Sequence, residues 1–153
     1  MGEKYDSTED TLNHIKRIRE LLSDAADELM LRGQLHDKSK LSEPEKSIFD
    51  EYTPKLKGCT YGSDEYKQYL VDLKDALDHH YANNSHHPEH YENGINGMNL
   101  LDLVEMLFDW KASSERHDDG DIYRSIDINA KRFNIPDYLV DIFKNTVKNQ
   151  GWK

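Results

Sequence analysis

The spacing of the apolar residues limits what this chain can fold into more than any other feature. Leu12, Ile15, Ile18 and Leu22 recur at intervals of three and four residues, which is the repeat of one face of an α-helix. Glycine and proline are sparse, with 8 and 4 copies in 153 residues, and runs of β-branched residues are missing. The sequence therefore predicts an all-α fold.

The same periodicity, read with the turn residues, predicts a bundle of about six to seven helices. Gly33 should end the first helix, and the helix over 99–116 is the most apolar, so it should be central and buried. Polar stretches at 57–64, 83–97 and 117–121 should be loops, with one short turn starting at Pro88. The helices are expected at 7–32, from 34 onward with His36-Asp37, and at 42–55, 65–81, 99–116, 122–132 and 136–149.

Length and charge set further limits. A chain of 153 residues suits one domain, 1–153. Its net charge of -10 argues against bulk binding of nucleic acid, which needs a surplus of lysine and arginine. The polar start resembles no signal peptide, and no stretch approaches the roughly 20 apolar residues of a membrane span. With Cys59 as the single cysteine, no intrachain disulfide is expected, and we expect a cytoplasmic protein.

Histidine is the most unusual residue type in its distribution. His36 precedes Asp37, and five of the eight histidines lie within the twelve residues from His79 to His90. Neutral imidazole and carboxylate are the usual ligands of divalent first-row metals. The leading hypothesis is therefore a histidine–carboxylate metal centre, and the alternative is a polar, pH-sensitive loop that binds metal only adventitiously.

Helical phase ranks some of these residues. It points His80 inward and His79 toward water, whereas His86, His87 and His90 fall in a loop and cannot be ranked. His14 shares the apolar face of the first helix, where a lone histidine is more often a satisfied core residue than a ligand.

Asp109 lies inside the most apolar helix, with Asp102 and Glu105 on the same face. A buried carboxylate must be paired or must bind a metal, because desolvating it alone is too costly. A metal-ligand role and an ion pair with Lys111 or Arg116 both remain open for Asp109.

The order of these residues is similar to the signature of the HD superfamily of all-helical, metal-dependent phosphohydrolases. The segment His36-Asp37-Lys38-Ser39-Lys40 is similar to the His-Asp-x-Gly-Lys motif of several HD branches, with Ser39 in place of glycine. The whole chain also resembles an HD-like family of uncharacterised phage and bacterial proteins, the DUF5662 type. The corresponding series is His14, His36-Asp37, His80, His87 (or His86) and Asp109.

The resemblance implies a compact HD-like bundle in a bacterial or phage-infected cell, and a divalent metal such as Mn, Fe, Co, Ni or Zn, with Mg also compatible. His80 and His87 are closer in sequence than in two-metal HD enzymes. This leaves two alternatives for the number of ions. In the first, a single ion is held by His14, His36, Asp37 and Asp109. In the second, His80 and His87 in addition bind a second ion or the leaving phosphate.

The implied activity is hydrolysis of a small phosphate substrate, most naturally a nucleotide, with the ion as Lewis acid. Alternatives are a non-catalytic metal- or ligand-binding module and an HD-type di-iron oxygenase. Tyr138, Phe143 and Trp152 could cover the core or form a homo-oligomer surface. Candidates to neutralise substrate charge are Lys40, Lys111 and Arg116, and candidates to orient water are Glu89 and Asp102.

Overall fold

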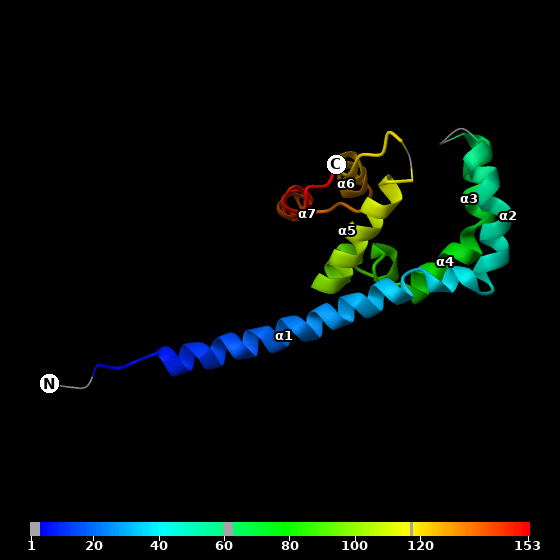
Figure 1. Cartoon of the computed structure of the whole chain (residues 1–153). Coiled ribbons are helices and arrows are strands. Elements are labelled where there is room, and N and C mark those ends of the chain that lie inside the picture. Colours follow the sequence, from blue (N-terminus) through cyan, green and yellow to red (C-terminus); the bar gives the residue numbers. More distant parts are fainter. Residues whose placement is uncertain (1–3, 60–62, 117) are drawn as a thin grey trace. The chain divides into compact units, whose positions relative to one another are not determined.

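The computed structural model describes residues 4–59, 63–116 and 118–153, and within these ranges it contains the helices α1 to α7, three short 3₁₀-helices η1 to η3, and no strand (Figure 1). The predicted all-α fold is confirmed. His117 and part of the loop predicted over 57–64 lie outside the described residues. The chain divides into two units, Met1–Leu35 and His36–Lys153, and the expectation of one domain stays a prediction.

The first unit consists of a short N-terminal segment and α1 (Thr8–Leu35). The prediction that Gly33 ends this helix is wrong, because α1 continues to Leu35. One internal glycine costs a helix about 1 kcal/mol, which the other residues of a 28-residue helix offset. The chain leaves the helical conformation at Asp37, which has a left-handed φ of 53°. The helix expected from residue 34 onward is therefore not formed.

The second unit begins with η1 (Lys38–Leu41), α2 (Glu45–Gly58), α3 (Asp64–Asp72) and α4 (Lys74–Asn83), and α2 packs against both η1 and α4 (Figure 1). The single helix predicted over 65–81 is divided at Leu73, which follows the last residue of α3 and precedes the first residue of α4. Leu73 is 2% exposed. The break lets α3 and α4 each follow its own direction along α2 while Leu73 stays buried.

The rest of the second unit comprises η2 (Pro88–His90), η3 (Gly94–Gly97), α5 (Leu100–Ser114), α6 (Ile122–Arg132) and α7 (Asp137–Gln150). The turn predicted at Pro88 is η2, and η3 is an additional turn in the same loop. The apolar core lies among α5, α6 and α7, which pack in sequence order. The core residues are Met106, Leu107, Trp110, Ile122, Ile126, Ile135, Phe143 and Val147.

The expectation that the most apolar helix is central and buried holds for one side of α5. Leu100 is 73% exposed and Phe108 is 46% exposed, whereas Met106 is 1% exposed. Only one side of α5 contributes to the apolar core, and another carries Glu105 and Asp109. This amphipathic use of an apolar helix brings carboxylates next to the core.

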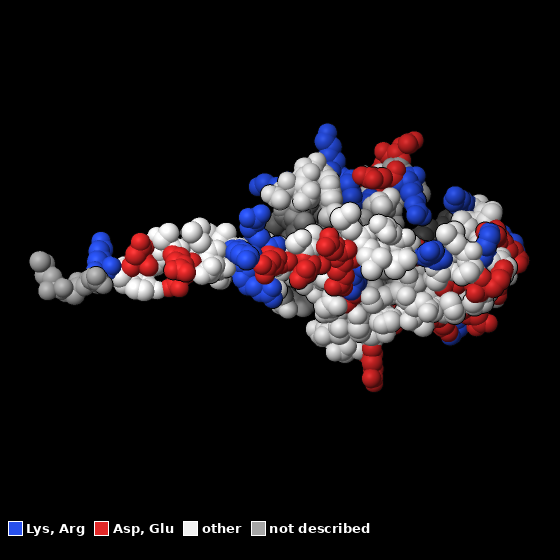
Figure 2. All heavy atoms as spheres, turned by 60° about the horizontal axis from the view of Figure 1, so that its bottom comes forward, with Lys and Arg blue, Asp and Glu red and all other residues white. Residues whose placement is uncertain are grey.

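The surface carries both signs of charge with an acidic excess. On the face shown in Figure 2, lysine and arginine side chains are interspersed with aspartate and glutamate, in keeping with the net charge of -10. Each helix in the described part of the chain is too short or too polar to span a bilayer.

Candidate metal centre

Three histidines meet at the end of α4. His80 lies in the last turn of α4, and His86 and His87 follow in the loop that leads to η2. The side-chain amide of Asn84 donates to the His80 carbonyl at 2.8 Å, and the Asn84 carbonyl accepts from the His87 backbone N–H at 3.3 Å. This turn places Nε2 of His80 2.9 Å from Nε2 of His87. His80 and His86 are each 2% exposed, so the imidazoles meet inside the protein.

Asp37 faces these histidines from the turn before η1. Its left-handed backbone is a conformation that aspartate adopts more readily than most residues. Lys40 holds the turn, because its backbone N–H donates to the Asp37 carbonyl at 2.9 Å and its Nζ donates to Asp37 Oδ2 at 2.6 Å. Asp37 Oδ1 then lies 3.2 Å from His80 Nε2 and 3.4 Å from His86 Nε2.

The spacing of these donor atoms fits one cation. Nitrogen and oxygen ligands bind first-row metals at about 2.0–2.2 Å, so neighbouring donors on one ion lie about 3.0–3.5 Å apart. The donors of Asp37, His80, His86 and His87 all lie within 4.8 Å of one another. Within the described residues, Asp37 Oδ1 and His86 Nε2 are buried and have no hydrogen-bond partner. Such atoms are rare in folded proteins, and a cation between them would satisfy both.

Glu105 on α5 orients two histidines. Its Oε1 lies 2.9 Å from Nδ1 of His36 and 3.1 Å from Nδ1 of His86. When Nδ1 of His86 meets this carboxylate, its Nε2 is left to face Asp37. His36 Nε2 lies 3.4 Å from Asp109 Oδ1 and 3.7 Å from Asp37 Oδ2. Asp37 therefore lies between two sets of donors, with one carboxylate oxygen toward each.

A second group of donors, His36, His86 and Glu105, also has the spacing of a metal site. One ion fits the first set of donors, and the second set leaves room for a second ion at His36. Neither group contains His14 or Asp109, which were expected among the ligands of a single ion, and the number of ions stays a prediction.

Glu45 is a buried carboxylate that the sequence pattern gave no reason to expect. It is the first residue of α2 and is 0% exposed, and its Oε2 lies 3.0 Å from Nδ1 of His80. Its Oε1 lies 2.7 Å from Nδ1 of His79, so His79, predicted to point toward water, is partly buried and paired. A carboxylate on the far nitrogen of a histidine fixes the ring and raises the basicity of the other nitrogen. In the sequence, a glutamate in a first helical turn signals only a favourable interaction with the helix dipole.

The histidines and carboxylates around Asp37 form a cluster, and neighbouring charges shift the pKa values of its members in opposite directions. Asp109 and Glu105 raise the pKa of His36 from 6.5 to about 10. Burial and the adjacent imidazoles lower the pKa of His87 from 6.5 to about 3. Burial works against the charge of Asp37, but the surrounding imidazoles and a nearby ammonium hold its pKa well below the usual range. His87 and Asp37 are thus in the forms that bind metal, neutral imidazole and ionised carboxylate.

A pocket of about 240 Å³ opens beside the cluster, and His87 and Asp109 form part of its wall. Glu89 and Arg132 also line it, and Arg132 Nη2 donates to Glu89 Oε1 at 2.7 Å. The pocket gives a small molecule access to two residues of the cluster. Arg132 was not among the residues predicted from the sequence, since it lies at the end of an amphipathic helix, where basic residues are common.

Asp102, a candidate for orienting water, is engaged in structural hydrogen bonds. It is 0% exposed, and its carboxylate accepts hydrogen bonds from the hydroxyls of Ser85 and Tyr91, each at 2.7 Å. It also accepts from the Asn99 backbone N–H at 3.0 Å, and the Asn99 side chain accepts from the Asp102 backbone N–H at 2.9 Å. This reciprocal pair is a capping box that starts α5. Asp102 therefore caps α5, and its predicted role in orienting water stays a prediction.

Of the three basic residues predicted to neutralise substrate charge, one lies at the cluster and two lie toward the C-terminal end of α5. Lys40 contacts the cluster through Asp37. Lys111 Nζ lies 2.9 Å from Glu115 Oε1 and donates to the carbonyl of Lys153 at 3.2 Å, and Arg116 is exposed beyond the end of α5. Neither Lys111 nor Arg116 lines the pocket, whereas Arg132 does. The predicted roles of Lys40, Lys111 and Arg116 stay predictions.

Two further histidines lie outside the cluster. His14 is an exposed residue of α1 in the first unit, whereas both groups of donors belong to the second unit. A ligand role for His14 stays a prediction. His90 is exposed, and its Nδ1 lies 2.7 Å from the Tyr81 carbonyl oxygen.

Comparison with known proteins identifies a family. The sequence model described as "Family of unknown function (DUF5662)" matches residues 3–149, so the chain belongs to that family. No curated protein and no solved structure matches the chain.

Proposed function

We propose that this member of the DUF5662 family is a metal-dependent phosphohydrolase that acts on a nucleotide or another small phosphate ester. One observation carries the proposal: the buried atoms Asp37 Oδ1 and His86 Nε2 lack hydrogen bonds and converge with two further imidazole nitrogens. Burying polar atoms without partners is costly, and a cation is the partner that suits a carboxylate and imidazole nitrogens together. The likeness of His36-Asp37-Lys38-Ser39-Lys40 to HD motifs supports the phosphohydrolase class, although analogy alone does not fix an activity.

A divalent ion at this place would supply Lewis acidity and a nucleophile near neutral pH. The protein's own groups would prepare the site. Glu45 and Glu105 each hold a histidine Nδ1, so that the Nε2 atoms of His80 and His86 face Asp37. Lys40 limits the movement of the Asp37 carboxylate. The substrate would enter by the pocket whose wall includes His87 and Asp109.

A second candidate function is a non-catalytic metal-binding module. Four protein donors, from Asp37, His80, His86 and His87, would complete a tetrahedral shell. Catalytic sites keep at least one position open for water or substrate. The adjoining pocket favours catalysis, and a closed shell favours the module.

Metal content of purified protein tests the centre. We expect about one or two equivalents of Mn, Fe, Co, Ni or Zn by elemental analysis, and loss of most of this metal in Asp37→Asn. Asp50→Asn is the matched control, because Asp50 is an exposed aspartate of α2 that forms an ion pair with Lys46 at 2.5 Å. The proposal fails if the wild-type protein binds no metal even after metal is added back, or if Asp37→Asn retains it in full.

Turnover separates the two candidate functions. The metal-loaded protein should release inorganic phosphate from a panel of nucleotides and small phosphate esters, and Asp37→Asn should not. Stable metal binding without phosphate release from any member of the panel would favour the non-catalytic module.

A further inference from the structure

We propose that the pocket beside the metal centre selects phosphate monoesters over polyphosphates, and that Arg132 is the residue that binds the phosphate. The inference rests on the proposed function and narrows its substrate class. Two observations support it: the position of Arg132, and the charges that line the two pockets beside the metal centre.

Arg132 is held in place on two sides at the pocket. Its Nη2 donates to Glu89 Oε1 at 2.7 Å, and its guanidinium carbon lies 4.7 Å from the ring centroid of Phe133. A guanidinium has five N–H donors, so the bond to Glu89 leaves donors for an anion. The side chain is 57% exposed, which leaves these donors accessible. A planar group fixed in this way suits a phosphate, because guanidinium groups bind phosphate in a two-pronged manner.

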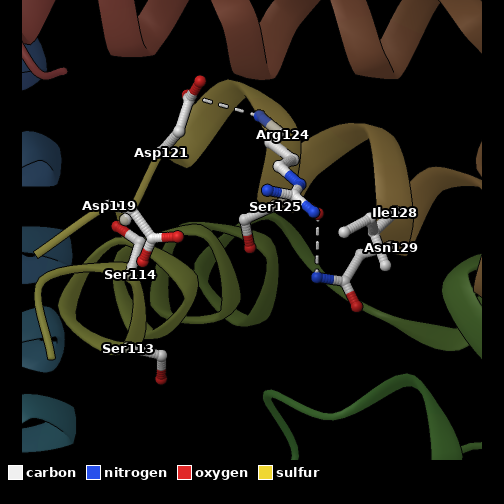
Figure 3. Close-up of a pocket in the computed structure, with 9 residues that line it drawn as sticks. Ser113, Ser114, Asp119, Asp121, Arg124, Ser125, Ile128 and Asn129 are labelled. Carbon is white, nitrogen blue, oxygen red and sulfur yellow. Dashed lines mark hydrogen bonds between the residues drawn. The ribbon is translucent and has the colours of Figure 1, made fainter. Parts of the chain in front are cut away.

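A second pocket, of about 300 Å³, continues from the first, because both are lined by Ser113, Ser125 and Asn129. It lies between the end of α5, the loop before α6 and the part of α6 from Arg124 to Asn129, as Figure 3 shows. The shared residues offer hydroxyl and amide groups and no charge. Asn129 Nδ2 donates to the Ser125 carbonyl at 3.0 Å, so its side-chain oxygen remains available to accept a hydrogen bond. The junction of the pockets therefore suits an uncharged, hydroxyl-bearing group.

The charges of the two pockets oppose a long anion. Their described lining residues include two arginines and four carboxylates. Asp119 and Asp121 stand at the far end, and Asp121 is fixed there because its Oδ1 accepts from the backbone N–H groups of Tyr123 and Arg124 at 2.8 and 3.3 Å. Like charges brought together in a partly enclosed site repel strongly. A single phosphate would lie in the first pocket, which His87 and Arg132 both line. A chain of phosphates would extend into the second pocket, where the two carboxylates of Asp119 and Asp121 outnumber the one arginine, Arg124. The lining residues that carry charge are Arg124, Arg132, Glu89, Asp109, Asp119 and Asp121.

The substrate class that fits is a phosphate monoester with an uncharged, hydroxylated leaving group, such as a nucleoside or a sugar alcohol. Arg132 would bind the phosphate, and Glu89 would act as a positioning residue through Arg132.

Calorimetry with inorganic phosphate and inorganic tripolyphosphate, on protein loaded with Mn²⁺, tests this assignment without requiring turnover. Arg132→Gln should weaken phosphate binding by about tenfold or more, the size of one charge-assisted contact. Arg132→Lys should recover part of the loss, because it keeps the charge and not the planar fork. Glu89→Gln should weaken phosphate binding by less than Arg132→Gln. Lys131→Gln is the matched control, since it removes an exposed positive charge from the same turn of α6 and lines neither pocket.

Tripolyphosphate should bind to the wild-type protein no more tightly than phosphate, although it carries more charge. Tighter binding of tripolyphosphate by tenfold or more, or an unchanged phosphate affinity in Arg132→Gln, would overturn the inference. Failure of the proposed function has a different signature, because phosphate would then bind through Arg132 while no ester in the panel is hydrolysed.

Discussion

The two halves of the second unit bury different kinds of side chain. Among α5, α6 and α7 the buried residues are apolar except for the capping residue Asp102, and the rings of Trp110 and Phe143 meet edge to face at 5.9 Å. Around α2 and α4 several of the buried residues are polar or ionisable, including Glu45, His80 and Asn84. One half is filled with groups whose burial stabilises the fold, and the other with groups whose burial is costly unless each is paired.

We expect this difference to separate the residues that determine folding from those of the proposed metal centre. The apolar side chains of the first half are stabilised by packing against one another and need no ligand. Within the described residues, the polar half contains two buried atoms that have no hydrogen-bond partner, Asp37 Oδ1 and His86 Nε2. We expect stability to depend chiefly on the first half, and metal affinity on the second.

The largest effect should come from Phe143→Ala in the apolar half. Phe143 is 3% exposed and contacts Trp110. Its truncation should lower the free energy of unfolding by about 3–5 kcal/mol, through lost burial and a cavity. Urea denaturation of the metal-free protein measures this change. Metal content per folded molecule should remain at the wild-type value, and a parallel loss of metal from the folded fraction would show that the two halves are not separable.

A smaller effect, on metal affinity, should follow from Glu45→Gln. The substitution keeps the shape of the side chain and removes the charge that holds Nδ1 of His80 at 3.0 Å. Loss of such a supporting carboxylate costs about 10–100-fold in metal affinity, which competition with a chelator can measure. Glu43→Gln is the control, because Glu43 is exposed and accepts a hydrogen bond from Ser47. Equal metal affinities in Glu45→Gln and Glu43→Gln would show that Glu45 does not support the metal centre.

The mildest test is the pH dependence of the metal-free protein. The pKa of His36 is raised to about 10, so its contribution to stability is complete below 6.5 and is lost as the pH rises toward 10. The pKa of His87 is lowered to about 3. As the pH drops below 6.5, this histidine is protonated in the unfolded state and stays neutral in the folded state. The free energy of unfolding therefore falls as the pH drops below 6.5.

Histidine NMR signals in the presence of a chelator would follow both groups. His36 should remain protonated at pH 7 to 8, where an unperturbed imidazole has lost most of its proton, and His87 should remain neutral at about pH 5, where an unperturbed imidazole is protonated. The same pH dependence should persist in Phe143→Ala, because no core residue titrates. Two histidines that both titrate near 6.5 would contradict the arrangement.

Helical periodicity predicted most of the fold. The expected span 122–132 coincides with α6 (Ile122–Arg132), and Asn99 and Pro136 stand next to the starts of α5 and α7. Two predictions were wrong: the end of the first helix at Gly33, and the unbroken helix through Leu73. In both cases the structure differs from what the local sequence signal favoured. Gly33 has weak helix propensity but lies inside a long helix, and Leu73 fits the apolar repeat although the chain turns there to bury it.

The sequence by itself determined that this chain is helical and that imidazoles and carboxylates are its chemically distinctive groups, because helix periodicity and residue chemistry are local properties. Only the tertiary structure decided which of them meet. It brought Glu45 to His80 and Glu105 to His36 and His86, and it set Arg132 beside Glu89 across 43 residues of chain. These pairings depend on helix packing and loop geometry, which join residues far apart in sequence and which no local pattern encodes.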